Sequence, residues 1–294
     1  MPARLRFEPS EGIWKGLKRL VSGELEQALT RLVAEPPEPW TALHETRKSI
    51  KRLRALLRLA ERPLGKAHRK LDRQLASSAR SLASAREADA AIEALDQLAS
   101  RASATETEGF ERARRAFVEA APRRLLVLRA LLLDARAELE RVKPHVDQWP
   151  EFDAGFELVE RGFRRTYRRA RKALGQARRK RSAHAFHELR KAVKTHLHQS
   201  QYFESLWPEE PNSRSLALAE LSTSLGEHHD LALLVVDLSQ RGFLDLATRA
   251  GERNAALEVQ ILDAAELLLS ERARSLTARF GARFGELAAG SFAT

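Results

Sequence analysis

The 294-residue sequence contains no cysteine, which excludes disulfide bonds, zinc–thiolate sites and cysteine nucleophiles and suits a reducing compartment. No apolar run approaches the roughly 18 residues of a membrane-spanning helix, and the N-terminal stretch MPARLRFEPSEG lacks the apolar core of a secretory signal. Only two tyrosines are present, and no stretch alternates in the manner of a β-strand. We therefore expect a cytoplasmic protein without disulfides, β-sheet or a membrane-spanning helix.

Sequence signatures of catalysis are also missing. There is no Gly-rich phosphate loop, dinucleotide fingerprint or nucleophile elbow, and no compact acidic cluster suited to Mg²⁺. The His-Glu pairs that start at His44 and His187 begin a zinc-protease motif, but Lys48 and Lys191 replace its second histidine. The sequence therefore predicts a protein that is not an enzyme and that has no metal site and no cofactor.

Positive charge, in contrast, is abundant. Lysine and arginine number 51 against 40 acidic residues, for a formal net charge of +11. The excess is uneven, because residues 161–181 hold eleven cationic residues and no acidic one, whereas residues 226–266 hold eight acidic residues and three arginines. This distribution indicates a polyanionic partner, which could be nucleic acid, an anionic membrane surface or a phosphate polymer.

The periodicity of the apolar residues predicts an all-α protein, since Ala, Leu, Arg and Glu dominate and the apolar positions recur at helical spacing. A chain of this length suits two domains of about 100 to 150 residues. Helix-breaking Pro144 and Pro150 predict a hinge between them. We expect an N-terminal helical bundle over residues 1–145 and a C-terminal bundle over residues 146–294.

The two halves repeat one another. HETRKSIKRLR begins at His44 and HELRKAVKTHL begins at His187, an offset of 143 residues. The same offset aligns Glu87 with Asp230, and we interpret each as a carboxylate that braces the neighbouring basic helix. The repeat predicts an internal duplication whose copies are related by a pseudo-two-fold axis.

Four groups of cationic residues each return to one face of a helix. The groups are His44, Arg47, Lys48, Lys51, Arg54 and Arg58; His187, Arg190, Lys191 and Lys194; Arg161, Arg164, Arg165, Arg168, Arg171 and Lys172; and, more weakly, Lys66, Arg69, Arg73 and Arg80. Apolar residues occupy the opposite faces, so that His196 is predicted to be a core residue. Adjacent His228 and His229 point in different directions.

A solvated helix face ordinarily mixes signs, because a Glu–Lys pair four residues apart contributes about 0.2 to 0.5 kcal/mol and like charges repel by similar amounts. The first two groups instead predict a purely cationic polar side on each helix, which a bound anion would stabilise. If both halves turn these sides toward their common axis, they line a basic groove. A basic solvated surface without a ligand is the alternative, which the duplication disfavours.

Nucleic acid is the alternative ligand. Proteins that bind single strands interleave aromatic residues with cations to stack the bases, yet the helix from His44 to Arg58 contains no aromatic residue. No helix-turn-helix, zinc-finger or RNA-recognition signature is present either. Sequence-independent binding to nucleic-acid phosphates stays open, whereas base readout has no support.

Five segments resemble the CHAD family, the conserved histidine α-helical domain. They are LHETRKSIKRLRALLRL (residues 43–59), ARSLASARE (79–87), YRRARKAL (167–174), FHELRKAVK (186–194) and LGEHHDLALL (225–234). The resemblance implies two pseudo-symmetric helical bundles around a basic central groove or pore that binds inorganic polyphosphate, with association with polyphosphate granules. Many members place an arginine where this chain has Leu197, which shortens the second cationic group.

The resemblance also implies a set of ligand-facing residues. By position these are His44, Arg47, Lys48, Lys51, Arg52, Arg54, Arg58, Arg164, Arg165, Arg168, Arg171, Lys172, His187, Arg190, Lys191 and Lys194, to which Arg69 and Arg73 of the fourth group are added. We thus expect a cytoplasmic protein that binds inorganic polyphosphate and has no membrane partner. The sequence identifies no protein partner and no oligomeric state.

Overall fold

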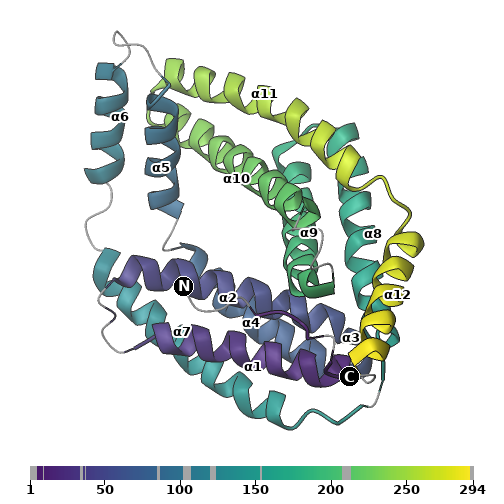
Figure 1. The fold of residues 1–294 in the computed structure, drawn as a ribbon. Coiled ribbons are helices and arrows are strands. Elements are labelled where there is room, and N and C mark those ends of the chain that lie inside the picture. Colours follow the sequence, from purple (N-terminus) through teal and green to yellow (C-terminus); the bar gives the residue numbers. More distant parts are fainter. Residues whose placement is uncertain are drawn as a thin grey trace.

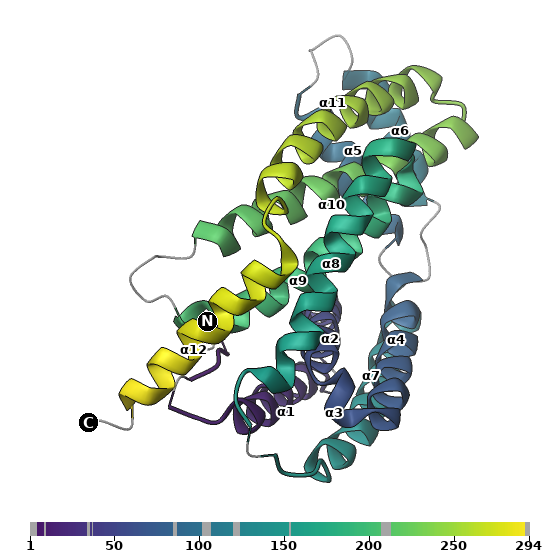
Figure 2. The ribbon, with the colours of Figure 1, turned by 90° about the vertical axis from the view of Figure 1, so that its right-hand side faces the viewer.

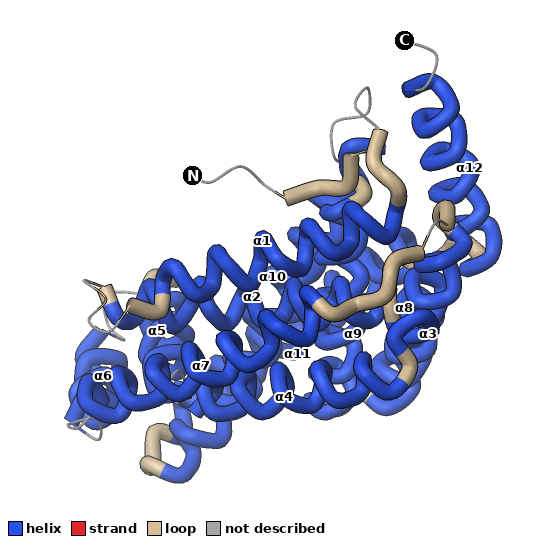
Figure 3. The backbone as a smooth tube through the Cα atoms, turned by 90° about the horizontal axis from the view of Figure 1, so that it is seen from below, coloured by secondary structure: helices blue, strands red, loops and turns tan. Residues whose placement is uncertain are grey.

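The computed structural model describes residues 5–8, 10–33, 36, 38–84, 87–101, 107–119, 124–152, 154–206 and 213–291. These residues form helices joined by short loops and contain no strand, which confirms the all-α prediction (Figure 3). The elements are α1 (Ile13–Arg31), α2 (Pro39–Leu59), α3 (Glu61–Leu64), α4 (Lys66–Ser84), α5 (Glu87–Ala99), α6 (Thr107–Glu119), α7 (Arg124–Asp147), α8 (Glu157–Lys180), α9 (Ala183–Tyr202), the 3₁₀ turn η2 (Glu204–Leu206), α10 (Ser213–Gln240), α11 (Leu244–Leu268) and α12 (Ala273–Ser291). None of the described helices combines the length and the hydropathy needed to cross a bilayer.

The helices form two packed groups that meet at α2 (Figure 1). Helices α1, α2, α4 and α7 pack together, while α8, α9, α10 and α11 form the second group, with α12 alongside α8 (Figure 2). Helix α5 packs between α6 and α10, so it leaves the first group and contacts the second. Contacts between α2 and both α8 and α9 join the two groups.

The helix bounds follow the 143-residue offset of the sequence repeat. Shifted by 143, residues 39–59 of α2 become 182–202, and α9 spans residues 183–202. Shifted likewise, α4 and α5 together become 209–242, the region that contains the single helix α10. These helix bounds are consistent with an internal duplication. The duplication itself and the division into two domains at residue 145 remain predictions.

The prolines Pro39 and Pro144 occupy different positions within their helices. Pro39 occupies the first turn of α2, where a missing N–H costs nothing because that group has no intrahelical acceptor. Pro144 lies inside α7, which continues to Asp147, so the expected hinge does not begin at Pro144. Burial of Val142, Val146 and Trp149 holds the last turn in place against the proline penalty of about 3 kcal/mol. Pro208 and Pro211 are helix breakers, and their positions predict the end of a later helix; both lie outside the described residues.

The apolar faces predicted for the two repeated helices are buried in one core. Leu43, Ile50 and Leu53 of α2 and Phe186 and Leu189 of α9 are each at most 2% exposed. His196 is fully buried, with its ring 5.3 Å from that of Phe163 and 5.0 Å from that of Tyr167. The prediction of a core histidine at this position is confirmed.

Gly162 permits the close approach of α8 to the end of α2. A Cβ atom at Gly162 would meet the carbonyl oxygen of Arg58 and would lie 2.6 Å from the carbonyl oxygen of Leu59. Only a residue without a side chain fits this contact, because the opposing atoms belong to the backbone and cannot move independently. The contact sets α8 against the C-terminal end of α2 and so positions its cationic residues.

Candidate anion-binding site

Helices α2 and α9 meet through their C-terminal halves. Arg58 Nη1 donates a hydrogen bond to Thr195 Oγ1 (3.0 Å), and Gln199 Nε2 donates one to the Ala55 carbonyl oxygen (2.8 Å). Figure 1 shows that the two helices diverge toward their N-terminal ends, where His44 and His187 lie. At 1.5 Å per residue, the path from His44 through the crossing to His187 is about 30 Å long. The cationic residues that lie along this path are here called the α2–α9 surface: His44, Arg47, Lys48, Lys51, Arg54 and Arg58 of α2, and His187, Arg190, Lys191 and Lys194 of α9.

Guanidinium groups are concentrated where α2, α8 and α9 meet. Burial lowers the pKa of Arg58 to about 10, and the charges of Arg54, Arg169 and Arg165 act in the same direction, while Asp72 opposes them. Arg54 makes two hydrogen bonds to Asp72, at 2.8 and 3.2 Å. The carboxylate therefore only partly offsets the repulsion around Arg58.

Carboxylates interrupt the cationic sides of both repeated helices. Lys48 Nζ donates to Glu45 Oε1 (2.7 Å), and Lys191 pairs with Glu188 in the same i, i+3 relation. Arg52 lies 3.8 Å from the buried Glu24. The expectation of a purely cationic polar side is therefore wrong, because carboxylates three residues earlier on the helix reach the lysines and reduce the repulsion.

His187 contacts a histidine of α10 that the sequence analysis did not select. The rings of His187 and His229 lie 4.6 Å apart, and their Nδ1 atoms are separated by 3.3 Å. Burial lowers the pKa of His229 to about 4, and Arg190, His187, His228 and Lys51 contribute in the same direction. Burial, followed by the charges of Lys191 and Arg190, also lowers the pKa of His187. Both rings are therefore neutral at pH 7.

Two neighbouring residues of α10, His228 and Asp230, bear on further predictions from the sequence. His228 is buried against Phe186, with Nε2 3.4 Å from Glu258 Oε1, so the adjacent histidines do point in different directions. Asp230 lines a small cavity between α5 and α10 together with Glu227 and Arg253. The side chain of Glu87 lies outside the described residues, and the bracing role of this aligned pair remains a prediction.

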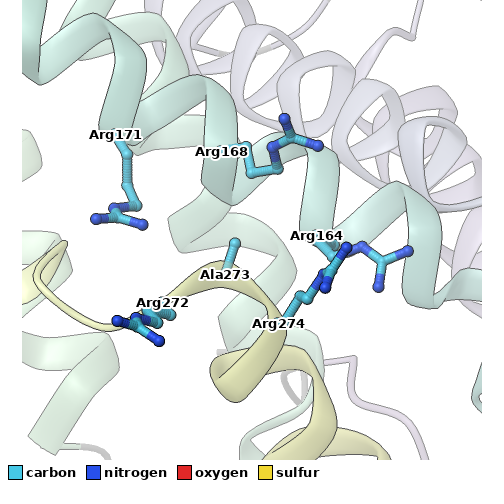
Figure 4. Close-up of a pocket in the computed structure, with 6 residues that line it drawn as sticks. All are labelled: Arg164, Arg168, Arg171, Arg272, Ala273 and Arg274. Atoms are coloured by element: carbon cyan, nitrogen blue, oxygen red, sulfur yellow. The ribbon is translucent and has the colours of Figure 1, made fainter.

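The cationic group of α8 is divided between two faces, which corrects its interpretation as one stripe. Arg165 pairs with Glu61 of α3, and Arg169 lies 3.7 Å from Glu188 of α9, so both face the α2–α9 surface. Arg164, Arg168 and Arg171 instead line a separate cavity with α12 (Figure 4). Successive helical residues are rotated by about 100°, so side chains from one run of basic residues reach both faces.

The remaining predicted residues lie around these groups. Arg190 of α9 approaches α10, since a Cβ atom at Gly226 would lie 3.8 Å from its Nη2. Lys51 and Lys194 both act electrostatically on the buried His198, which places them near the crossing. The structure therefore brings side chains of the first and second predicted groups together.

The outermost predicted residues are less closely connected. Arg69 and Arg73 are exposed on α4, where Arg73 Nε donates to the Arg69 carbonyl oxygen (3.3 Å). Arg69 acts electrostatically on His68, as Arg54 and Arg58 do, but no described contact joins Arg73 to α2 or α9. Lys172 is exposed on α8. Within the part of the chain that the structure describes, no three histidine, aspartate or glutamate side chains are grouped to hold a metal ion.

The described residues form an all-helical domain with basic residues on α2, α8 and α9. The family model for the CHAD domain matches residues 21–236, and the chain belongs to the CHAD family. The crystal structure of the CHAD domain from the plant Ricinus communis superposes with a TM-score of 0.65 at 20% sequence identity, covering 92% of this chain and 96% of that chain. At this identity the likeness shows a shared fold. No curated protein matches the sequence.

The buried histidines predict a loss of stability in acid. Burial lowers the pKa of His196 and of His198 to about 3, from an ordinary value of 6.5. Their contribution is complete above pH 6.5 and is lost as the pH falls toward 3, because there the unfolded chain binds protons that the folded chain excludes. We expect the free energy of unfolding, measured with urea, to fall by several kcal/mol across this range. The variant His196→Phe should show a shallower dependence on pH; an unchanged slope would contradict this assignment.

Proposed function

We propose that this CHAD-family chain binds inorganic polyphosphate along the α2–α9 surface. The observation that carries the proposal is the crowding of Arg54, Arg165 and Arg169 around Arg58. Asp72, Glu61 and Glu188 pair with the first three of these arginines, so three carboxylates offset the repulsion among four guanidinium groups only in part. Such like-charge contacts destabilise the folded chain, and a bound polyanion would relieve them. The CHAD family is itself associated with polyphosphate binding.

The shape of the surface favours a long ligand. Its path of about 30 Å follows two diverging helices, so a compact anion would reach only a fraction of the cationic groups. A linear polymer of regularly spaced negative charges would contact both helices at once. Affinity should therefore rise with polymer length until the surface is filled, and it should fall steeply with salt because binding releases counterions.

Each residue type has a distinct role in this proposal. Arginines such as Arg58 and Arg190 would offer forked N–H donors to phosphate oxygens, whereas lysines would act as mobile point charges. The carboxylates of Glu45 and Glu188 hold Lys48 and Lys191 in the absence of ligand. Phosphate oxygens would compete with these carboxylates for the lysines and replace them. Binding of this kind requires no catalytic step, metal or cofactor.

The competing function is sequence-independent binding of nucleic acid. It is the weaker candidate, because Phe163 and Tyr167, the aromatic residues nearest the α8 cations in sequence, are buried in the core and cannot stack on bases. Competition between fluorescent long-chain polyphosphate and single- or double-stranded DNA or RNA at equal salt and equal phosphate concentration tests the choice. We expect polyphosphate to be displaced only by polyphosphate. Equal displacement by nucleic acid would support the alternative.

Binding should take up protons at neutral pH. The neutral His187 lies beside Lys191 and Arg190, and a phosphate bound there would favour its protonated form. Calorimetry at pH 7 in buffers of different ionisation enthalpy should reveal the uptake, which His187→Gln should reduce. The contact between His187 and His229 needs one N–H and one lone pair, so the pair should take up no more than one proton. Identical heats in all buffers would exclude this role of His187.

The place of binding in the cell follows from the same proposal. A chain that holds polyphosphate would accumulate in cytoplasm wherever the polymer is stored, which includes polyphosphate granules. Fluorescent fusions should therefore colocalise with polyphosphate staining, and the charge-reversed variant described in the Discussion should be dispersed.

A further inference from the structure

A second basic site lies between α8 and the start of α12. A cavity of about 490 Å³ is lined by Arg164, Arg168 and Arg171 of α8 and by Arg272, Ala273 and Arg274 at the beginning of α12. Figure 4 shows Arg171 and Arg272 toward one end of this cavity and Arg164 and Arg274 toward the other. Five arginines from two elements far apart in the sequence thus line one space.

Little negative charge of the protein enters this cavity. Glu160 accepts a hydrogen bond from Arg164 Nη1 (2.9 Å), and the Glu271 carboxylate pairs with Arg279 (3.0 Å). Among the residues that the structure describes, no carboxylate forms an ion pair with Arg168, Arg171, Arg272 or Arg274, and all four are exposed. Like charges are therefore held together in a hollow where an anion could contact several of them.

The beginning of α12 adds to the positive potential. Ala273 is the first residue of this 19-residue helix, and it is one of the residues that line the cavity. The first N–H groups of a helix lack intrahelical acceptors and carry partial positive charge. They supplement the five arginines, which are the principal feature of the site.

The cavity is separate from the α2–α9 surface. Arg165 and Arg169 contact α3 and α9, whereas Arg164, Arg168 and Arg171 contact the cavity on another side of α8. A ligand that occupies the cavity therefore does not need to occupy the crossing of α2 and α9. The inference consequently does not depend on the function proposed above.

We propose that this cavity is a second anion-binding site, which takes a compact oligophosphate of about three linked phosphate groups. Arg164 and Arg171 are separated by about 10 Å along α8, so a single phosphate would not contact both ends. Arginine forks suit phosphate oxygens, and the residues that line the cavity include no aromatic ring to hold a nucleobase. The oligophosphate is either a free short chain or the end of a long chain.

Calorimetry with tripolyphosphate tests the site. The cavity variant Arg168→Gln with Arg272→Gln should bind tripolyphosphate at least tenfold more weakly than the natural chain. The control that removes the same charge is Arg112→Gln with Arg115→Gln on exposed positions of α6, which should bind tripolyphosphate within twofold of the natural chain. The crossing variant Lys51→Gln with Lys194→Gln compares the cavity with the α2–α9 surface, and it should lose less affinity for tripolyphosphate than the cavity variant. Circular dichroism should show equal helix content in all variants.

The affinity for long-chain polyphosphate shows whether the cavity takes a free short chain or the end of a long chain. If the cavity binds free short chains, the cavity variant should keep its long-chain affinity within threefold; if it holds the end of a long chain, that affinity should fall as well. The inference is overturned if the natural chain does not bind tripolyphosphate, if the α6 control loses as much affinity as the cavity variant, or if only the crossing variant loses it. Failure of the function proposed above would instead appear as long-chain binding that is insensitive to the crossing variant.

Discussion

Replacing Lys51 and Lys194 by glutamate should lower the affinity for long-chain polyphosphate by about 100-fold or more. The charges of both lysines act on the buried His198, so two different helices place them in the neighbourhood of one residue of the crossing. A hydrogen bond to a charged group contributes about 1.5 to 3 kcal/mol, so the loss of two costs at least about 3 kcal/mol. Since about 1.4 kcal/mol corresponds to a factor of ten, the expected change is readily measured by titration at fixed salt.

The control for this variant is Arg112→Glu with Arg115→Glu. These arginines are exposed on α6, which lies away from the crossing of α2 and α9 (Figure 1), and the substitutions change the net charge by the same amount. The control should bind within about threefold of the natural chain, a small effect that reflects long-range electrostatics. If both variants lose affinity equally, overall charge would account for binding and the α2–α9 surface would not be the site.

Gly162→Ala should lower the free energy of unfolding by about 2 to 3 kcal/mol. The new methyl group would meet the Arg58 carbonyl oxygen and would lie 2.6 Å from that of Leu59, so α8 would have to move away from α2. This loss exceeds the gain of about 1 kcal/mol that alanine normally gives over glycine within a helix. Urea denaturation of the two proteins at pH 7 measures the difference.

Gly175→Ala on the same helix is the matched control. A Cβ atom at Gly175 would have Arg179 Nη1 as its nearest neighbour, at an ordinary contact distance of 3.6 Å. We expect this variant to gain about 0.5 to 1 kcal/mol in stability, because the helix propensity of alanine acts without a clash. Equal effects of the two substitutions would show that the close approach at Gly162 does not hold in solution.

The consequences of Gly162→Ala should extend to binding. Displacement of α8 from the end of α2 would move Arg165 and Arg169 away from Arg58 and so disperse the charge at the crossing. Polyphosphate affinity of the folded variant should therefore decrease, while Gly175→Ala should leave it unchanged. The close packing at Gly162 thus also fixes the distance between Arg58 and the arginines of α8, and with it the positive charge density of the site.

Features that depend on local periodicity could be predicted from the order of the residues. Apolar residues three and four apart predicted all-helical structure, the buried sides of α2 and α9 and the core position of His196, because a helix places such residues on one face wherever it packs. The pairs Glu45–Lys48 and Glu188–Lys191 were equally local, and the i, i+3 rule applied to the acidic residues would have predicted them.

The way in which these helix faces are combined depends on the packing of the whole chain. Core packing sets the angles between the helices and so determines which residues meet. Examples are the crossing at Arg58 and Thr195, the contact of His187 with His229, and the cavity between α8 and the arginines Arg272 and Arg274. The same packing kept Pro144 inside α7 and divided the basic run of α8 between two faces. Helical periodicity predicts which residues share one side of a helix, but it does not predict which other helix packs against that side. The packing partner depends on the long-range fit of side chains and on backbone contacts such as the one at Gly162.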